Sequence, residues 1–162
     1  MSDDLTELYQ EVILDHSRRP RNFGELPNAS VVVHGDNPSC GDEIHLGVRF
    51  ADDGALQEIK FSGHGCAISQ ASASMMTLKL KGKSRDEAEQ LLHGFEQLIM
   101  DGKAPESVKL GDAKLLEGVR KFPQRVKCAM LAWRAAEQAL RQSQGAASVS
   151  TEVELSEAQS AL

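Results

Sequence analysis

The sequence has no excess of basic residues and no long hydrophobic run. Its 162 residues include 18 Lys and Arg against 24 Asp and Glu, which gives a net charge of −6 with neutral histidines. A broadly basic nucleic-acid surface is therefore not expected. The longest apolar run near Cys128 covers only residues 129–133, far short of the roughly 18 residues that cross a bilayer. We expect neither nucleic acid nor a membrane among the partners.

Cysteine is also scarce, and the three cysteines form no Cys-x-x-Cys pair. An odd number counts against a fully paired disulfide framework and leaves free thiols, a metal site or a reactive thiol. The N-terminal segment is acidic and lacks the positive region and the apolar core of a secretory signal. These absences predict a reducing, cytoplasmic location.

Hydrophobic periodicity predicts an α+β fold. Helical spacing of apolar residues predicts helices over about 4–17, from the capping box at Ser84 to Gly102 and from Pro123 to about Leu140. Small residues over 66–80 indicate a buried helix, and a short helix is expected over about 110–119. Three β-prone runs, 31–33, 44–50 and 56–61, lie between the first two helices, and Asp53-Gly54 predicts a hairpin. We expect a small antiparallel three-stranded sheet with one face covered by several helices.

The composition changes after Gln142. The last residues are small and polar, contain no Lys or Arg, and include Glu152, Glu154 and Glu157. Such a segment offers almost no periodic apolar surface. We therefore expect one domain over residues 1–142 and a mobile acidic tail over 143–162, and we expect deletion of residues 145–162 to leave folding unchanged.

Three cysteines and one aspartate occupy positions suited to metal binding. Cys40 and Asp42 flank a glycine in a turn between two β-prone runs, so both side chains can project toward one point. Cys66 opens a helix, where the helix dipole favours a thiolate. Cys128 falls in the second turn of the last helix. Three thiolates and one carboxylate would complete a tetrahedral zinc site, and burial as a small hydrophobe is the alternative for Cys66 and Cys128.

Three segments resemble the signature segments of the IscU/NifU-N family of iron–sulfur scaffold proteins. They are Asn37-Pro38-Ser39-Cys40-Gly41-Asp42, then Gly63-His64-Gly65-Cys66-Ala67-Ile68-Ser69, and Arg125-Val126-Lys127-Cys128-Ala129. The resemblance runs from about Leu5 to Leu140. It implies the fold of this family and a role in iron–sulfur cluster assembly.

Within this family the chain is similar to the SufU branch. Lys127 stands where the scaffold branch typically has a histidine, and the chain lacks that branch's Leu-Pro-Pro-Val-Lys chaperone-docking segment. The resemblance implies a zinc-dependent sulfurtransferase that accepts persulfide sulfur from a SufS-type cysteine desulfurase and supplies downstream iron–sulfur assembly machinery. The zinc ligands that it implies are Cys40, Asp42, Cys66 and Cys128.

His64 competes with Asp42 for the fourth ligand position, because imidazole is a common zinc ligand and His64 lies two residues before Cys66. We favour Asp42, which matches the motif. The other histidines are expected to be surface or structural residues: His16, His34, His45 and His93.

Two residues are assigned to sulfur transfer. Cys40 is the favoured acceptor, because a thiolate on a turn can swing out, whereas Cys128 on its helix cannot do so without unwinding that helix. Arg125 lies three residues before Cys128, so a helix places both on one face. The resemblance favours a catalytic role for Arg125, and a solvated helix start is the alternative for Arg125 and Lys127.

Three functions stay open on the sequence. The first is the zinc-dependent sulfurtransferase, the second is a scaffold on which a [2Fe–2S] cluster is assembled and transferred, and the third is a module that zinc merely stabilises. Lys127 favours the first over the second, because lysine is a poor metal ligand at neutral pH compared with histidine. Whether Cys40 or Cys128 carries the persulfide also stays open.

Overall fold

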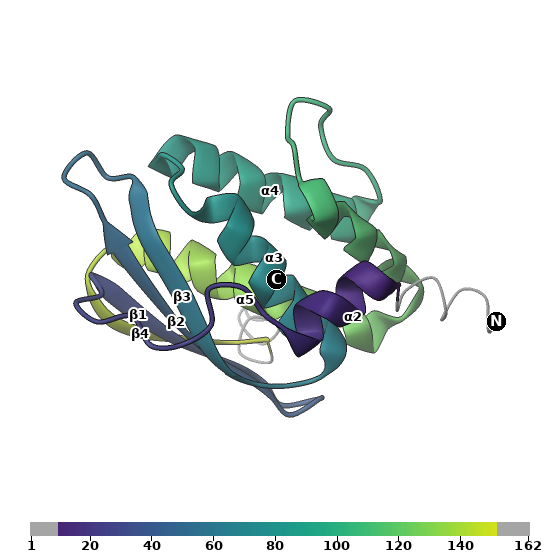
Figure 1. The fold of residues 1–162 in the computed structure, drawn as a ribbon. Helices are drawn as coiled ribbons and strands as arrows, with labels where there is room; N and C mark the ends of the chain where they lie inside the picture. The colour runs from purple at the N-terminus through teal and green to yellow at the C-terminus, as the bar shows by residue number, and fades with distance from the viewer. Residues whose placement is uncertain (1–9, 152–162) are drawn as a thin grey trace, which may run out of the picture.

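The fold is α+β, as the sequence predicts, in a computed structural model that describes residues 10–151 (Figure 1). The elements in chain order are α2 (Glu11–Arg18), β1 (Val31–Asn37), β2 (Asp42–Phe50), β3 (Leu56–His64), α3 (Ala67–Leu80), α4 (Arg85–Asp101), the 3₁₀ helix η1 (Gly111–Lys121), α5 (Pro123–Gln142) and β4 (Gly145–Ser150). The expected start of the first helix, near residue 4, lies outside the described residues. Within the described range, no helix is long and apolar enough to span a membrane.

Local signals in the sequence explain where the helices begin and end. The Ser84 hydroxyl accepts a hydrogen bond from the Glu87 amide, and the Glu87 carboxylate accepts one from the Ser84 amide, which completes the expected capping box of α4. The same helix ends at Gly102, which adopts the left-handed conformation that glycine tolerates. Pro123 occupies the first turn of α5, where its missing N–H costs nothing.

The sheet has four strands in the order β3-β2-β1-β4, so the expected count of three is too small. The pairs β1–β2 and β2–β3 are antiparallel as predicted, whereas β4 runs parallel to β1 at the edge. Residues 145–150, which we expected to belong to the tail, thus form a strand of the sheet. This strand, Gly-Ala-Ala-Ser-Val-Ser, is joined to the sheet by main-chain hydrogen bonds, which composition does not report. Residues 152–162 lie outside the described part of the chain.

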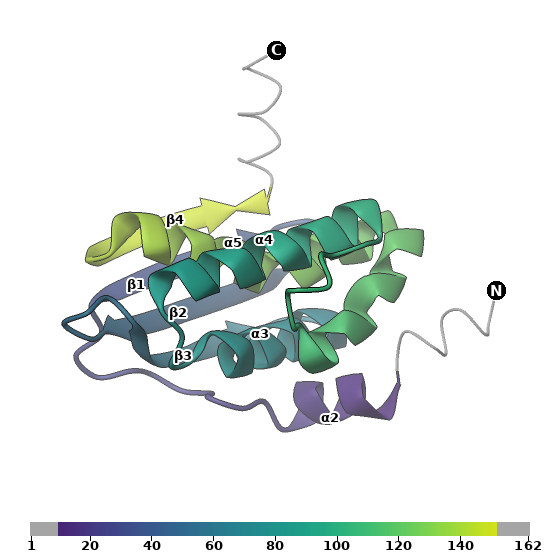
Figure 2. The same ribbon diagram turned by 90° about the horizontal axis from the view of Figure 1, so that it is seen from above.

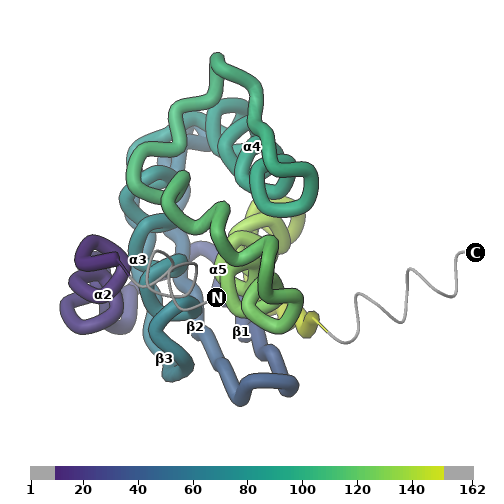
Figure 3. The backbone as a smooth tube through the Cα atoms, turned by 90° about the vertical axis from the view of Figure 1, so that its right-hand side faces the viewer, coloured from purple at the N-terminus to yellow at the C-terminus, as the bar shows by residue number. Residues whose placement is uncertain are grey.

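The helices form layers on one face of the sheet. Figure 1 shows α3 and α5 against the sheet, with α4 farther out. In Figure 2, seen from above, α4 lies along α5, and α2 lies on the other side of α3. Figure 3 shows the same arrangement end on, with α2 beside α3. The opposite face of the sheet carries no helix among residues 10–151.

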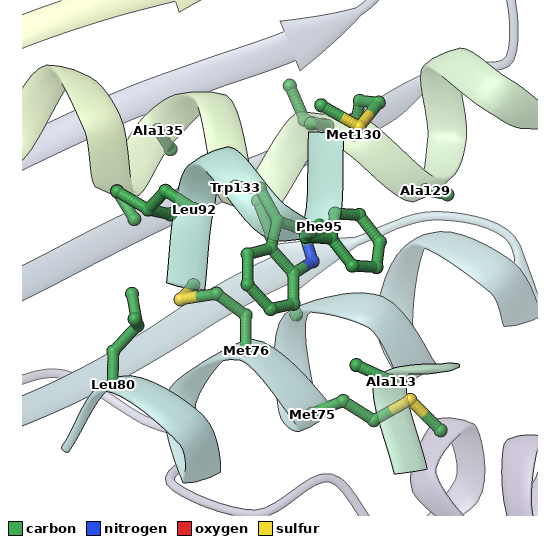
Figure 4. Packing of buried hydrophobic residues seen from close by; sticks show 14 of the residues in the cluster. Met75, Met76, Leu80, Leu92, Phe95, Ala113, Ala129, Met130, Trp133 and Ala135 are labelled. Carbon is green, nitrogen blue, oxygen red and sulfur yellow. The ribbon is translucent and has the colours of Figure 1, made fainter. Parts of the chain in front are cut away.

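Two stacked aromatic rings lie at the centre of the packing between α4 and α5. Phe95 of α4 stacks on Trp133 of α5 with ring centroids 3.9 Å apart, and Met76 lies beside them (Figure 4). The Trp133 Nε1 donates to Ser72 Oγ at 2.9 Å, and that hydroxyl donates to the Ala129 carbonyl at 2.6 Å. These buried hydrogen bonds fix α3 against α5, the two helices that carry Cys66 and Cys128.

A truncation tests the role of β4. We expect a chain ending at Gln144 to unfold at a lower urea concentration than a chain ending at Thr151. Loss of β4 leaves the edge of β1 without its parallel partner, and backbone hydrogen bonds contribute about 0.5–1.5 kcal/mol each, so the free energy of unfolding should fall by roughly 2 kcal/mol or more. Both chains lack residues 152–162, so the difference reports β4 and Thr151. Equal urea midpoints for the two chains would show that residues 145–150 do not stabilise the fold and belong to the tail.

Candidate metal centre

The ends of four elements bring the predicted ligands together. Cys40 lies in the turn between β1 and β2, Asp42 opens β2, Cys66 caps α3, and Cys128 lies in the second turn of α5. Donor atoms of Cys40, Asp42 and Cys128 all lie within 4.8 Å of one another. Cys66 adjoins this group through a hydrogen bond with the Cys128 thiol. Among residues 10–151, no other three donors of this kind lie so close together.

The Asp42 carboxylate is held by a hydrogen bond at each oxygen. It is only 1% exposed, Oδ1 accepts from the Cys66 amide at 2.9 Å, and Oδ2 accepts from the Asn37 amide group at 3.0 Å. Gly65 makes this position possible, because a Cβ there would lie 2.5 Å from Asp42 Oδ1. The glycine before Cys66 therefore serves the carboxylate as well as the start of the helix.

Asn37 is a central residue that sequence reasoning missed. Its side chain is fully buried and donates to Asp42 Oδ2 and, at 3.5 Å, to Cys128 Sγ. The side-chain oxygen Oδ1 of Asn37 accepts from Thr151 Oγ1 at 3.1 Å, so the chain just beyond β4 also reaches the centre. The one signal in the sequence is its place at the start of the first signature segment, which does not reveal the contacts.

The thiols influence one another strongly. The hydrogen bond from Cys128 lowers the pKa of Cys66 to about 6, and the Ser69 amide and the charge of Arg125 act in the same direction against the opposing effect of burial. The hydrogen bond with Cys66 raises the pKa of Cys128, and burial raises it further. The hydrogen bond between the two thiols therefore favours ionisation of Cys66 over ionisation of Cys128.

The three thiols differ in their access to solvent. Cys128 is fully buried, whereas Cys40 and Cys66 are partly exposed. Cys66 also accepts a hydrogen bond from the Ser69 amide at 3.5 Å as the N-cap of α3. Cys40 lies on the turn, where its amide donates to the Asn37 carbonyl at 3.2 Å.

The two cations before Cys128 occupy different surroundings. The charge of Arg125 contributes to the lowered pKa of Cys66. Lys127 instead lines a groove between α4 and α5 together with His93 and Met100. Arg125 is therefore the cation that the structure associates with the centre.

His64 does not join the predicted ligands. It is exposed, and its Nε2 lies 2.8 Å from Glu43 Oε2. This position favours Asp42 over His64 as the oxygen or nitrogen donor of the centre. Of the other histidines, His16 is buried and its Nδ1 lies 2.7 Å from Ser74 Oγ, whereas His34, His45 and His93 are half-buried or exposed.

The donor set suits zinc. A tetrahedral zinc ion with bonds of about 2.0–2.3 Å holds its ligand atoms roughly 3.3–3.8 Å apart, which agrees with donor atoms that all lie within 4.8 Å. Thiolates are also the ligands of iron–sulfur clusters, so the donor chemistry alone admits both kinds of metal centre.

The chain is similar in sequence and in fold to known proteins. Residues 8–148 match the NifU-like N terminal domain family. The iron-sulfur cluster assembly scaffold protein IscU of Streptococcus pyogenes serotype M1 is 45% identical over 88% of each chain. The zinc-dependent sulfurtransferase SufU of Bacillus subtilis is 44% identical over 88% of this chain and 95% of its own. A crystal structure of a SUF-system scaffold protein from Fervidobacterium islandicum AW-1 superposes with a TM-score of 0.77 at 39% identity, covering 82% of this chain and 96% of that one.

Substitution of Asn37 tests how the centre is held. We expect Asn37→Ala to lower the free energy of unfolding by about 1–3 kcal/mol, because Asp42 and Thr151 each lose a buried partner. Thr151→Val, which removes only the outer hydrogen bond, should cost less. Urea denaturation of the metal-free proteins measures both. An Asn37→Ala variant as stable as the unaltered chain would show that Asp42 does not depend on this amide.

Proposed function

The chain belongs to the NifU-like N-terminal domain family, and on that premise we propose that this iron–sulfur cluster assembly protein of the IscU/SufU type acts as a zinc-dependent sulfurtransferase. We further propose that it works in the cytoplasm, takes sulfur from a SufS-type cysteine desulfurase and passes it to downstream iron–sulfur assembly machinery. The observation that carries the proposal is the convergence of Cys40, Asp42 and Cys128 beside Cys66.

The four converging residues would hold the zinc ion. Zinc, when bound, stabilises thiolates at neutral pH, including that of a buried cysteine such as Cys128. Asp42 completes the set with an oxygen whose position is fixed by Asn37 and by the Cys66 amide. The name of the Bacillus subtilis relative, a zinc-dependent sulfurtransferase, supports this choice of metal.

Cys40 accepts the sulfur in this proposal. Once released from the metal, its thiolate would attack the terminal sulfur of the partner's cysteine persulfide, so that a new S–S bond forms on Cys40 while the S–S bond of the persulfide breaks. The partner's cysteine leaves as a thiolate, and no external oxidant or reductant is needed. Cys40 suits this step because it is partly exposed on a turn next to Gly41, which has a positive φ of 71°.

The other thiols suit the step less well. Cys128 is fully buried within α5, so reaching a partner would require that helix to unwind. Cys66 caps α3, and its exposure would break its hydrogen bond with the Ser69 amide. Both cysteines are therefore assigned to holding the metal rather than to carrying the sulfur.

A scaffold for a [2Fe–2S] cluster is the second candidate. The name of the Streptococcus pyogenes relative supports it, and three thiols with one carboxylate also suit a cluster. Lys127 argues against it, because its side chain lines the groove between α4 and α5 and a lysine is a poor metal ligand at neutral pH. We therefore favour the sulfurtransferase.

Cys40→Ser tests the acceptor. This variant should no longer stimulate a cysteine desulfurase or carry a persulfide, because a serine hydroxyl cannot form the S–S bond. Desulfurase turnover measures the first effect. Peptide mapping of the persulfide on the unaltered chain gives an answer even if the variant folds poorly. A persulfide found on Cys66 or Cys128 and not on Cys40 would refute the assignment.

Arg125→Ala tests the role of the cation. Arg125 stabilises a freed thiolate or orients the partner without binding the metal, so the variant should retain its zinc while desulfurase stimulation falls about 10–100-fold. Lys127→Ala is the matched control and should behave like the unaltered chain, and Arg125→Lys should restore part of the activity. Equal loss of zinc and stimulation would make Arg125 structural, and unchanged stimulation would leave it a surface residue.

A further inference from the structure

The face of the sheet opposite α3 and α5 carries a cluster of histidines and carboxylates away from the cysteines. His34 of β1, Glu43 and His45 of β2, and His64 of β3 alternate with buried residues of the same strands, so they point away from α3 and α5. Strand register sets His34 opposite His45 and Glu43 opposite His64. Four side chains that bind metals thus meet from three strands.

One carboxylate joins two of the imidazoles. Glu43 Oε1 lies 3.2 Å from His34 Nε2, and Glu43 Oε2 lies 2.8 Å from His64 Nε2. The His45 ring lies against the His34 ring with centroids 4.7 Å apart. An imidazole nitrogen and a carboxylate oxygen bound to one zinc ion lie roughly 3.3 Å apart, close to these separations.

The charge around the cluster favours a cation. Asp36 lies opposite Glu43 in the register, which adds a second carboxylate to the cluster. The cation on the same face of β3, Lys60, pairs with Gly47, farther along β2. The end of the sheet with the histidines is therefore the acidic end of this face.

We propose that His34, Glu43, His45 and His64 form a second site for a divalent transition metal of the zinc class. Imidazole with carboxylate suits such ions, whereas hard ions prefer oxygen donors alone. The donor atoms are spread more widely than those of the cysteine centre, so binding requires the imidazoles to rotate toward Glu43 and His45. Their exposure permits this rotation, because the side chains of His34 and His64 are 42% and 70% exposed.

The site is independent of the cysteine centre. Glu43 follows Asp42 in sequence, but neighbouring residues of a strand point to opposite faces, and Asp42 is buried while Glu43 is not. The second site is open to solvent and lacks thiolates, so it binds its ion more weakly and exchanges it faster than the cysteine centre.

The test is a zinc titration of the full chain by calorimetry, after its cysteine centre has been loaded and excess metal removed. The unaltered chain should bind a further zinc ion. The double variant His34→Gln/His64→Gln should bind this ion about 10–100-fold more weakly or not at all, because even the removal of outer-shell partners of a metal weakens its binding by about this factor. His93→Gln, an exposed histidine on α4, is the matched control and should bind as the unaltered chain does.

Two results would overturn the second site: no further zinc bound by the unaltered chain, or equal affinity in the double variant. A loss as large in His93→Gln would also refute it, because the binding would then be nonspecific. Failure of the second site can be distinguished from failure of the proposed function. If the cysteines bind no zinc, the difference between the unaltered chain and the double variant still reports the histidine site.

Discussion

The centre depends on the hydrogen bonds that hold the buried carboxylate of Asp42. Burial of a charge is costly unless hydrogen bonds or a cation compensate it. Here the Cys66 amide and the Asn37 side chain each bond one oxygen, and Gly65 leaves the space that the carboxylate fills. The same contacts tie β2 to β1 and to the start of α3, so the ligands are positioned by the fold before any ion binds.

The packing of the helices carries this arrangement across the molecule. Ser72 and Trp133 hold α3 against α5 by hydrogen bonds, and the small residues of α3 let the two helices approach closely. Cys66 and Cys128, far apart in sequence, therefore meet at one end of this helix pair. Cys40 lies on the turn between β1 and β2 and not on a helix, and it is partly exposed.

Much of the fold follows from local sequence signals. The capping box at Ser84, Pro123 at the start of α5 and the Asp53-Gly54 hairpin all predict what the structure contains. The strand β4 could not be predicted, because its small residues carry little hydrophobic pattern. It is held by main-chain pairing with β1 and by packing of Ala147 and Val149 against the core.

The candidate site was predicted only in part. The three signature segments name the four candidate ligands through resemblance, since their spacing alone forms no metal motif. The role of Asn37 could not be foreseen, because it arises from contacts with Asp42, Cys128 and Thr151, which only the fold brings together. The cluster around Glu43 depends likewise on strand register.

Metal analysis of the freshly isolated protein, washed with a weak chelator to empty exposed sites, tests the central claim most directly. The account predicts one zinc ion per chain, held by the thiolates and by Asp42, with no stoichiometric iron or sulfide. Stoichiometric iron and sulfide without zinc would contradict it and would make the chain a scaffold for a cluster.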